Sequence, residues 1–96
     1  MIEVIKFGAD WCGPCRMVAP TVEKLKAKYN VEGSDVQITS IDVDQSPEFS
    51  REHKIQSIPA FVIRKDGITV AKKIGVLTQD QLEEEINKLQ TSKIDE

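Results

Sequence analysis

Apolar residues recur along the first half of the chain with two different periods. The run from Ile2 to Phe7 would place apolar side chains on both faces of a strand, which is typical of a central strand in a parallel sheet. A helix is predicted from about Cys12 to Tyr29, because its apolar residues recur at helical spacing, as Val18, Val22, Leu25 and Tyr29. After a loop over residues 30–35, a second strand is predicted from Val36 to Val43. This half is therefore a βαβ unit, whose crossover we expect to be right-handed.

The second half is predicted to be antiparallel. Ser46-Pro47 has the residue types of an N-cap and a first-turn proline, which indicates a short helix ending near Lys54. Strands over Ala60–Arg64 and Ile68–Ile74 flank Asp66-Gly67, a pair that favours the type I′ turn of a hairpin.

A last helix is predicted after Thr78. Thr78 and Gln81 have the spacing of a capping box, and Leu77 and Leu82 could form a hydrophobic staple. The buried stripe of this helix consists of Leu82, Ile86 and Leu89. We expect residues 91–96 to fray.

Strands and helices thus alternate in the order βαβ-α-ββα, without a repeat, a low-complexity stretch or a linker. The class is α/β. A chain of 96 residues has room for one core, so we expect a single domain over residues 1–96.

Charge and segment composition exclude several classes of protein. The net charge is −3, with basic residues dispersed between acidic ones, so we expect no nucleic-acid partner. The chain opens without the basic and then apolar run of a secretory signal, and no apolar run approaches the ~18 residues of a membrane span. We therefore expect a cytoplasmic protein without membrane association. That compartment keeps thiols reduced, which favours a catalytic dithiol over a structural bridge.

The two cysteines of the chain lie three residues apart, within Trp11-Cys12-Gly13-Pro14-Cys15. The motif follows an apolar strand and begins a helix. Two thiols at this spacing can close a short disulfide ring, and the unpaired N–H groups of the first turn stabilise a thiolate on the first of them. In this context the pair indicates a redox disulfide.

Three other interpretations of the pair are weaker. A structural zinc site needs four ligands, and His53 is the single histidine, so a site would have to borrow a carboxylate. A structural disulfide over so short a ring would constrain the unfolded chain little. Buried inert thiols fit poorly with Gly13 and Pro14 between them, because these residues suit an exposed turn. We expect no metal site.

The sequence resembles the thioredoxin family at four places, which follow the family order. These are the segment Ala9–Met17, Pro20 in the following helix, Ile58-Pro59 before a strand, and Gly75 after the last strand. The resemblance covers essentially the whole chain. Full-length members have an extra strand and helix before the first strand predicted here, so we expect a compact thioredoxin without these two elements. In extent it is similar to glutaredoxins and to short thioredoxin-like proteins of archaea, bacteria and phages.

The resemblance implies a minimal thioredoxin fold, a four-stranded mixed sheet of order 2-1-3-4 with helices on both faces. Cys12, just beyond the carboxyl end of the first strand, would be the exposed nucleophile. As in thioredoxins, its thiolate would attack a substrate disulfide, and Cys15 would then resolve the mixed disulfide. The implied partners are disulfide-containing protein substrates and an electron donor of the thioredoxin reductase type. Apart from the redox-active Cys12–Cys15 disulfide, we expect no bound cofactor.

Residues around the motif have expected supporting roles. Gly13 would let a partner backbone approach closely, and Pro14 would pre-set the first helical turn. Trp11 is expected to be both packing and a platform for substrate, and the alternative for a large aromatic is core filling.

Ile58-Pro59 and Gly75 are the other expected substrate contacts. The resemblance implies that the Ile58–Pro59 bond is cis and faces the cysteines, where the backbone of Ile58 pairs with a substrate strand. Without the resemblance, an X-Pro bond would be expected to be trans. Gly75 borders the same surface, or is only a turn glycine with a positive φ.

Lys6 is the main departure from the family, which generally has a buried aspartate six residues before the first cysteine. Lys6 shares a strand face with Ile2 and Val4, where a lone ammonium is costly. It therefore needs a partner or a lowered pKa, and Asp42 on the next strand is the natural candidate. A charged Lys6 could hold Cys15 as thiolate, a neutral one could act as its base, and a snorkelling one would have no role.

Two other functions stay open. A glutathione-dependent glutaredoxin would have the same fold, but such proteins typically have Gly-Gly where this chain has Gly75-Val76. A non-catalytic binding module would not need both cysteines. Finally, the polar strand Val36–Val43 would lie at a sheet edge, and we expect a monomer.

Overall fold

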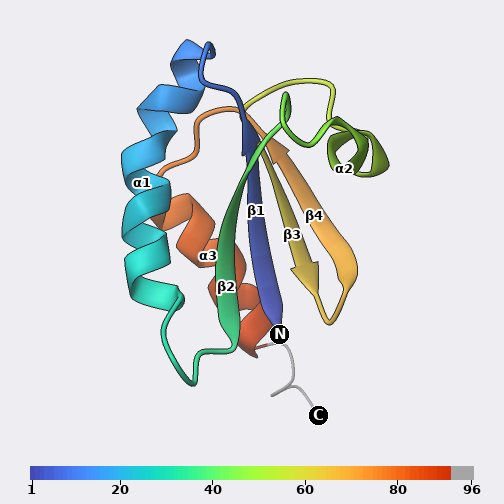
Figure 1. The fold of residues 1–96 in the computed structure, drawn as a ribbon. Helices are drawn as coiled ribbons and strands as arrows, with labels where there is room; N and C mark the ends of the chain where they lie inside the picture. The colour runs from blue at the N-terminus through green and yellow to red at the C-terminus, as the bar shows by residue number, and fades with distance from the viewer. Residues whose placement is uncertain (92–96) are drawn as a thin grey trace.

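A computed structural model describes residues 1–91, and Figure 1 draws residues 92–96 in grey. The elements are β1 (Ile2–Gly8), α1 (Gly13–Tyr29), β2 (Val36–Asp42), α2 (Pro47–Glu52), β3 (Ala60–Lys65), β4 (Ile68–Ile74) and α3 (Gln79–Thr91). The predicted element order is confirmed. Fraying is expected for residues 91–96. Thr91 is the last residue of α3, and the others lie outside the described residues.

The four strands form one mixed sheet of order β2-β1-β3-β4, as predicted. β1 runs parallel to β2 and antiparallel to β3, which in turn pairs antiparallel with β4. β1 is therefore central. Its carboxyl end and that of β2 lie at the same edge, where Gly8 pairs with Asp42 and Lys6 with Ser40.

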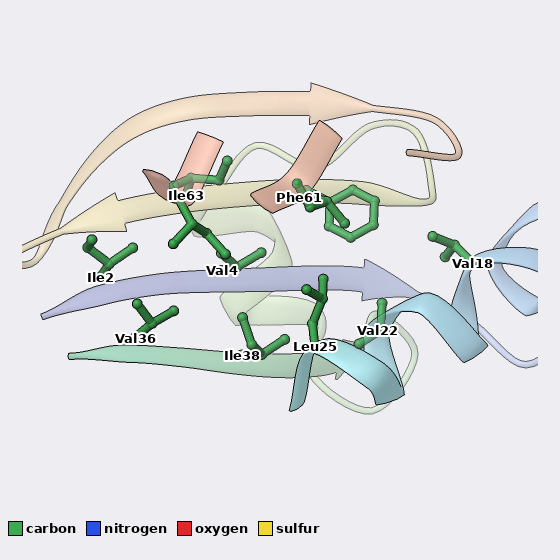
Figure 2. Packing of buried hydrophobic residues seen from close by; sticks show 11 residues of the cluster. Ile2, Val4, Val18, Val22, Leu25, Val36, Ile38, Phe61 and Ile63 are labelled. Carbon is green, nitrogen blue, oxygen red and sulfur yellow. The ribbon is translucent and has the colours of Figure 1, made fainter. Parts of the chain in front are cut away.

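Helices cover both faces of the sheet (Figure 1). The larger core lies between the sheet and the pair α1 and α3, and Figure 2 shows its side chains. It includes Ile2 and Val4 of β1, together with Val18, Val22 and Leu25 of α1. On the opposite face, a second cluster contains buried Ile5, Phe7, Ala60 and Val62, with Phe49 of α2 packed against it. Both faces of β1 are thus buried, as its continuous apolar run predicts.

Local signals set most element ends. Asp66 and Gly67 have φ values of 53° and 83°, as a type I′ turn requires. At the start of α3, the N–H of Thr78 donates to Oε1 of Gln81 at 2.9 Å, and the N–H of Gln81 donates to Oγ1 of Thr78 at 3.1 Å. The capping box is therefore confirmed. The Ser46 side chain makes no capping hydrogen bond, so only its position before Pro47 matches the prediction.

A hydrogen-bonded cluster around Glu83 joins α3 to the end of α1. Its carboxylate accepts hydrogen bonds from the Lys28 ammonium, from the Tyr29 hydroxyl at 2.7 Å and from the Gln79 amide at 2.9 Å. The hydrogen bond from Lys28, followed by that from Tyr29, lowers the pKa of Glu83 to about 2. Burial, with the hydrogen bond to Glu83, raises the pKa of Tyr29 to about 12.

We predict that Glu83→Gln lowers the free energy of unfolding at pH 7 by about 1–2 kcal/mol, because the amide loses charge-assisted hydrogen bonds. The pKa of Glu83 is about 2 in the fold against an ordinary value of 4.5. Its stabilisation is therefore complete above pH 4.5 and disappears as the pH falls towards 2. Urea unfolding at several pH values measures this. Glu84→Gln is the matched control, because Glu84 is 71% exposed. Equal losses in both variants would contradict the prediction.

Candidate active site

The two cysteines lie where the central strand is followed by the first helix. β1 ends at Gly8 and α1 begins at Gly13, with Cys12 as the N-cap residue. Cys12 and Cys15 form a disulfide, and their Cα atoms are 5.2 Å apart. The N–H of Cys15 donates to Sγ of Cys12 at 3.2 Å. This N–H is one that a helix leaves unpaired at its start, so it favours negative charge on Cys12 after reduction.

Both cysteines are buried in this disulfide form. Cys12 is 6% exposed and Cys15 3%. Ala9 belongs to the same cluster, and Val43 and Ile58 pack against it. The expectation that Cys12 is exposed is therefore wrong for this state, because apolar residues from three segments surround it.

Trp11 lies on the surface beside the cysteines. It is 67% exposed, and its Nε1–H donates to Oδ2 of Asp44 at 2.7 Å. Core filling is therefore excluded for Trp11. Asp44 is itself positioned by Asp42, whose Oδ1 accepts the Asp44 N–H at 2.8 Å. An exposed indole held at its polar end offers one apolar face to a partner.

The Ile58–Pro59 peptide bond is cis, as the resemblance predicted. The Ile58 carbonyl oxygen lies 3.9 Å from Sγ of Cys12. The Pro59 carbonyl oxygen accepts a hydrogen bond from the N–H of Gly75 at 2.8 Å. Gly75 has a φ of 105°, a region that favours glycine, so its turn role is confirmed. These contacts link the segment before β3 and the residue after β4 to Cys12.

Gly13 and Pro14 occupy the first two positions of α1. Pro14 is accommodated there because the N–H that it lacks would have no helical partner. At Gly13 the φ is not positive, and an added Cβ would meet no atom within 4 Å. Neither conformation nor internal space requires a glycine, so close approach of a partner backbone remains the predicted role.

Lys6 and Asp42 do not form the expected ion pair. Within residues 1–91, no hydrogen bond or ion pair to the half-buried Lys6 is found. Asp42 accepts backbone hydrogen bonds from its own turn and attracts Lys6 only at longer range. Burial, with repulsion from Lys26, lowers the pKa of Lys6. The strand pattern placed Lys6 on the face of Ile2 and Val4, which the structure packs against α1, but it could not give the distance between Lys6 and Asp42.

A pocket of about 470 Å³ opens beside Cys15, between the start of α1 and the carboxyl ends of β1 and β2. Its lining residues include Lys6, Gly8, Arg16 and Asp42.

Sequence reasoning missed two residues near the cysteines, Gly8 and Asp44. A glycine as the last residue of a buried strand was a usable signal for Gly8. For Asp44 the local sequence held none, because its contact with Trp11 spans 33 residues.

The described part of the chain shows no candidate metal site. No group of three or more His, Cys, Asp or Glu residues within it is placed to hold a metal ion. His53 instead packs against Phe7 and Phe49, with ring centroids 5.6 and 4.6 Å away. Of the helices within residues 1–91, none combines the length and apolar character needed to cross a membrane.

Comparison with known proteins agrees with this geometry. The family model for thioredoxin matches residues 2–88. The chain belongs to the thioredoxin family. It is 38% identical to a thioredoxin of Staphylococcus aureus over 87 residues, which are 91% of this chain and 81% of the relative.

Solved thioredoxin structures are similar over the same region. Mitochondrial thioredoxin 3 of Saccharomyces cerevisiae, in its oxidised form, is 39% identical with a TM-score of 0.77, over 91% of this chain and 77% of that one. A Fasciola hepatica thioredoxin is 36% identical with a TM-score of 0.79, over 91% and 79%. With its cysteine pair, this member of the thioredoxin family is a thiol–disulfide oxidoreductase with protein disulfide reductase activity. A glutaredoxin or a non-catalytic module is not favoured.

We predict that Asp44→Ala slows disulfide reduction about two- to fivefold, because an exposed hydrogen bond of about 0.5–1 kcal/mol no longer orients the indole. Trp11 is the only tryptophan, so fluorescence anisotropy reports its mobility directly and should fall. Asp44→Asn is the control, because its amide oxygen can still accept the hydrogen bond. Wild-type anisotropy and rate in Asp44→Ala would show that the contact does not matter.

Proposed function

We propose that this protein reduces protein disulfides with Cys12 as the nucleophile and Cys15 as the resolving thiol. The observation that carries the assignment is the hydrogen bond from the N–H of Cys15 to Sγ of Cys12. It favours the thiolate on Cys12, and a thiolate is the attacking species in disulfide exchange.

The reaction has two exchanges. The Cys12 thiolate attacks one sulfur of the substrate disulfide, and the other substrate sulfur leaves as thiolate, which gives a mixed disulfide. The Cys15 thiolate then attacks Sγ of Cys12, the bond between Cys12 and the substrate breaks, and the second substrate sulfur leaves. The substrate gains two electrons and the protein closes its disulfide. A dithiol or an enzyme of the thioredoxin reductase type would reopen it.

The substrate would bind over Trp11, Ile58 and Gly75. Pro59, the fourth expected contact, is fully buried, so it would position Ile58 and would not itself touch the substrate. The exposed indole and the contacts that join Cys12 to Ile58 and Pro59 to Gly75 support this placement. Ile74 and Val76, on either side of Gly75, are 53% and 47% exposed and add apolar area. A substrate segment lying there in extended form would present its disulfide to Cys12. We place this activity in the cytoplasm, as an electron carrier without a bound cofactor.

We predict that Cys12→Ser abolishes the acceleration by this protein of insulin reduction by dithiothreitol. Cys15→Ser should instead accumulate mixed disulfides, because only the resolving step is lost. Non-reducing electrophoresis and mass spectrometry detect the trapped species. Glutathione in place of dithiothreitol, with glutathione reductase, separates a glutaredoxin-like activity. Trapping by Cys12→Ser instead of Cys15→Ser would reverse the assignment.

The polar edge of the sheet favours a monomer. In the described sheet β2 lies at one edge, and its Gln37, Thr39, Ser40 and Asp42 give this edge a polar character that discourages pairing. We expect sedimentation at the mass of one chain at every concentration tested. Dimerisation that increases with concentration and disappears in Gln37→Lys would contradict a monomer.

A further inference from the structure

Lys6 and Cys15 approach the same small space over Gly8. A Cβ atom added to Gly8 would lie 3.2 Å from Nζ of Lys6 and 3.2 Å from Sγ of Cys15. The ammonium and the sulfur are therefore no more than twice this distance apart. All three residues line the pocket of about 470 Å³ that opens between α1 and the ends of β1 and β2.

Gly8 is favoured at this position because a side chain would occupy the space, and not because the backbone conformation requires a glycine. Its φ is not positive, so its conformation is open to any residue. A Cβ contact of 3.2 Å is tighter than ordinary van der Waals contact, and here it would arise on both sides at once. A Cβ at this position would therefore displace the Cys15 sulfur or the flexible end of Lys6 by a few tenths of an ångström.

The charge of Lys6 is only weakly compensated. No described residue forms an ion pair with it. The charged groups that act on it come from three segments; they are Glu23 and Lys26 of α1, Asp42 of β2 and Asp10 after β1. Arg16 lines the same pocket. Burial and Lys26 lower the pKa of Lys6, and the three carboxylates raise it. An ammonium without a bound anion in a pocket favours negative charge on a nearby group.

We propose that the Lys6 ammonium stabilises the thiolate of Cys15 across the space that Gly8 leaves open. Lys6 is thus a positioning residue for the resolving step, an inference that rests on the proposed roles of the two cysteines. The Cys15 thiol releases its proton to water in the pocket, and its thiolate attacks Sγ of Cys12 as the substrate thiolate leaves. In the opposite direction, when a reducing dithiol opens the disulfide, the same charge stabilises Cys15 as the leaving thiolate.

The test measures the pKa of Cys15 in a Cys12→Ser background, from the pH dependence of its alkylation by iodoacetamide. Adding Lys6→Met should slow alkylation at pH 7 by at least about threefold and move the profile to higher pH, because a nearby cation is lost. Lys6→Arg should restore the profile. Lys24→Met, which removes an exposed cation from α1, the helix that carries Cys15, is the control for net charge and should leave the profile unchanged.

Gly8→Ala provides a second variant that keeps every charge. It should move the alkylation profile of Cys15 in the same direction but by less than Lys6→Met, because its methyl group displaces the ammonium or the sulfur by only a few tenths of an ångström. Circular dichroism checks that each variant is folded. A wild-type profile in folded Lys6→Met, or a shift of equal size in Lys24→Met, would overturn the proposal. If Lys6→Met does not fold, a wild-type profile in folded Lys6→Gln would overturn it.

These measurements do not depend on disulfide reduction. The Cys12→Ser background has one thiol and no turnover, so its titration tests the ammonium alone. Insulin reduction by the protein with both cysteines tests the proposed function separately. Reduction by the wild-type protein with an unshifted Cys15 profile in Lys6→Met would refute only the role of Lys6.

Discussion

The junction between β1 and α1 determines the chemistry of this protein. The strand is central and buried on both faces, and α1 is anchored to it through Val18, Val22 and Leu25. The first turn of the helix is therefore held at the carboxyl end of the strand, with the N–H of Cys15 directed at Sγ of Cys12. A thiol that is ordinary in an unfolded chain becomes, in this position, the favoured site for negative charge.

The other contacts of the site depend on this junction. Ile58 reaches Cys12 because β3 pairs antiparallel with β1, which brings the start of β3 to the carboxyl end of β1. Asp44 reaches Trp11 because β2 runs parallel to β1 and ends at the same edge. One sheet edge thus collects residues from segments that are far apart in the sequence, which is the general arrangement of sites in α/β proteins.

The site separates its two cysteines electrostatically. Cys12 receives a backbone N–H, whereas Cys15 lies near the Lys6 ammonium across Gly8. The ammonium is half-buried and its acidic neighbours act only from a distance, so burial outweighs them and lowers its pKa. Each sulfur therefore has a different source of positive potential, one from the helix backbone and one from a side chain.

Sequence alone determined the elements, their order and the redox motif, because apolar periodicity, Asp66-Gly67 and the capping box are local signals that the structure reproduces. Together with a family resemblance, it also predicted the sheet order and the cis bond before Pro59. Tertiary structure alone decided the burial of Cys12, the Asp44 contact, the missing ion pair between Lys6 and Asp42, and the space over Gly8. These depend on distances between separate segments, and a pattern along one strand fixes a side chain's face but not its neighbours.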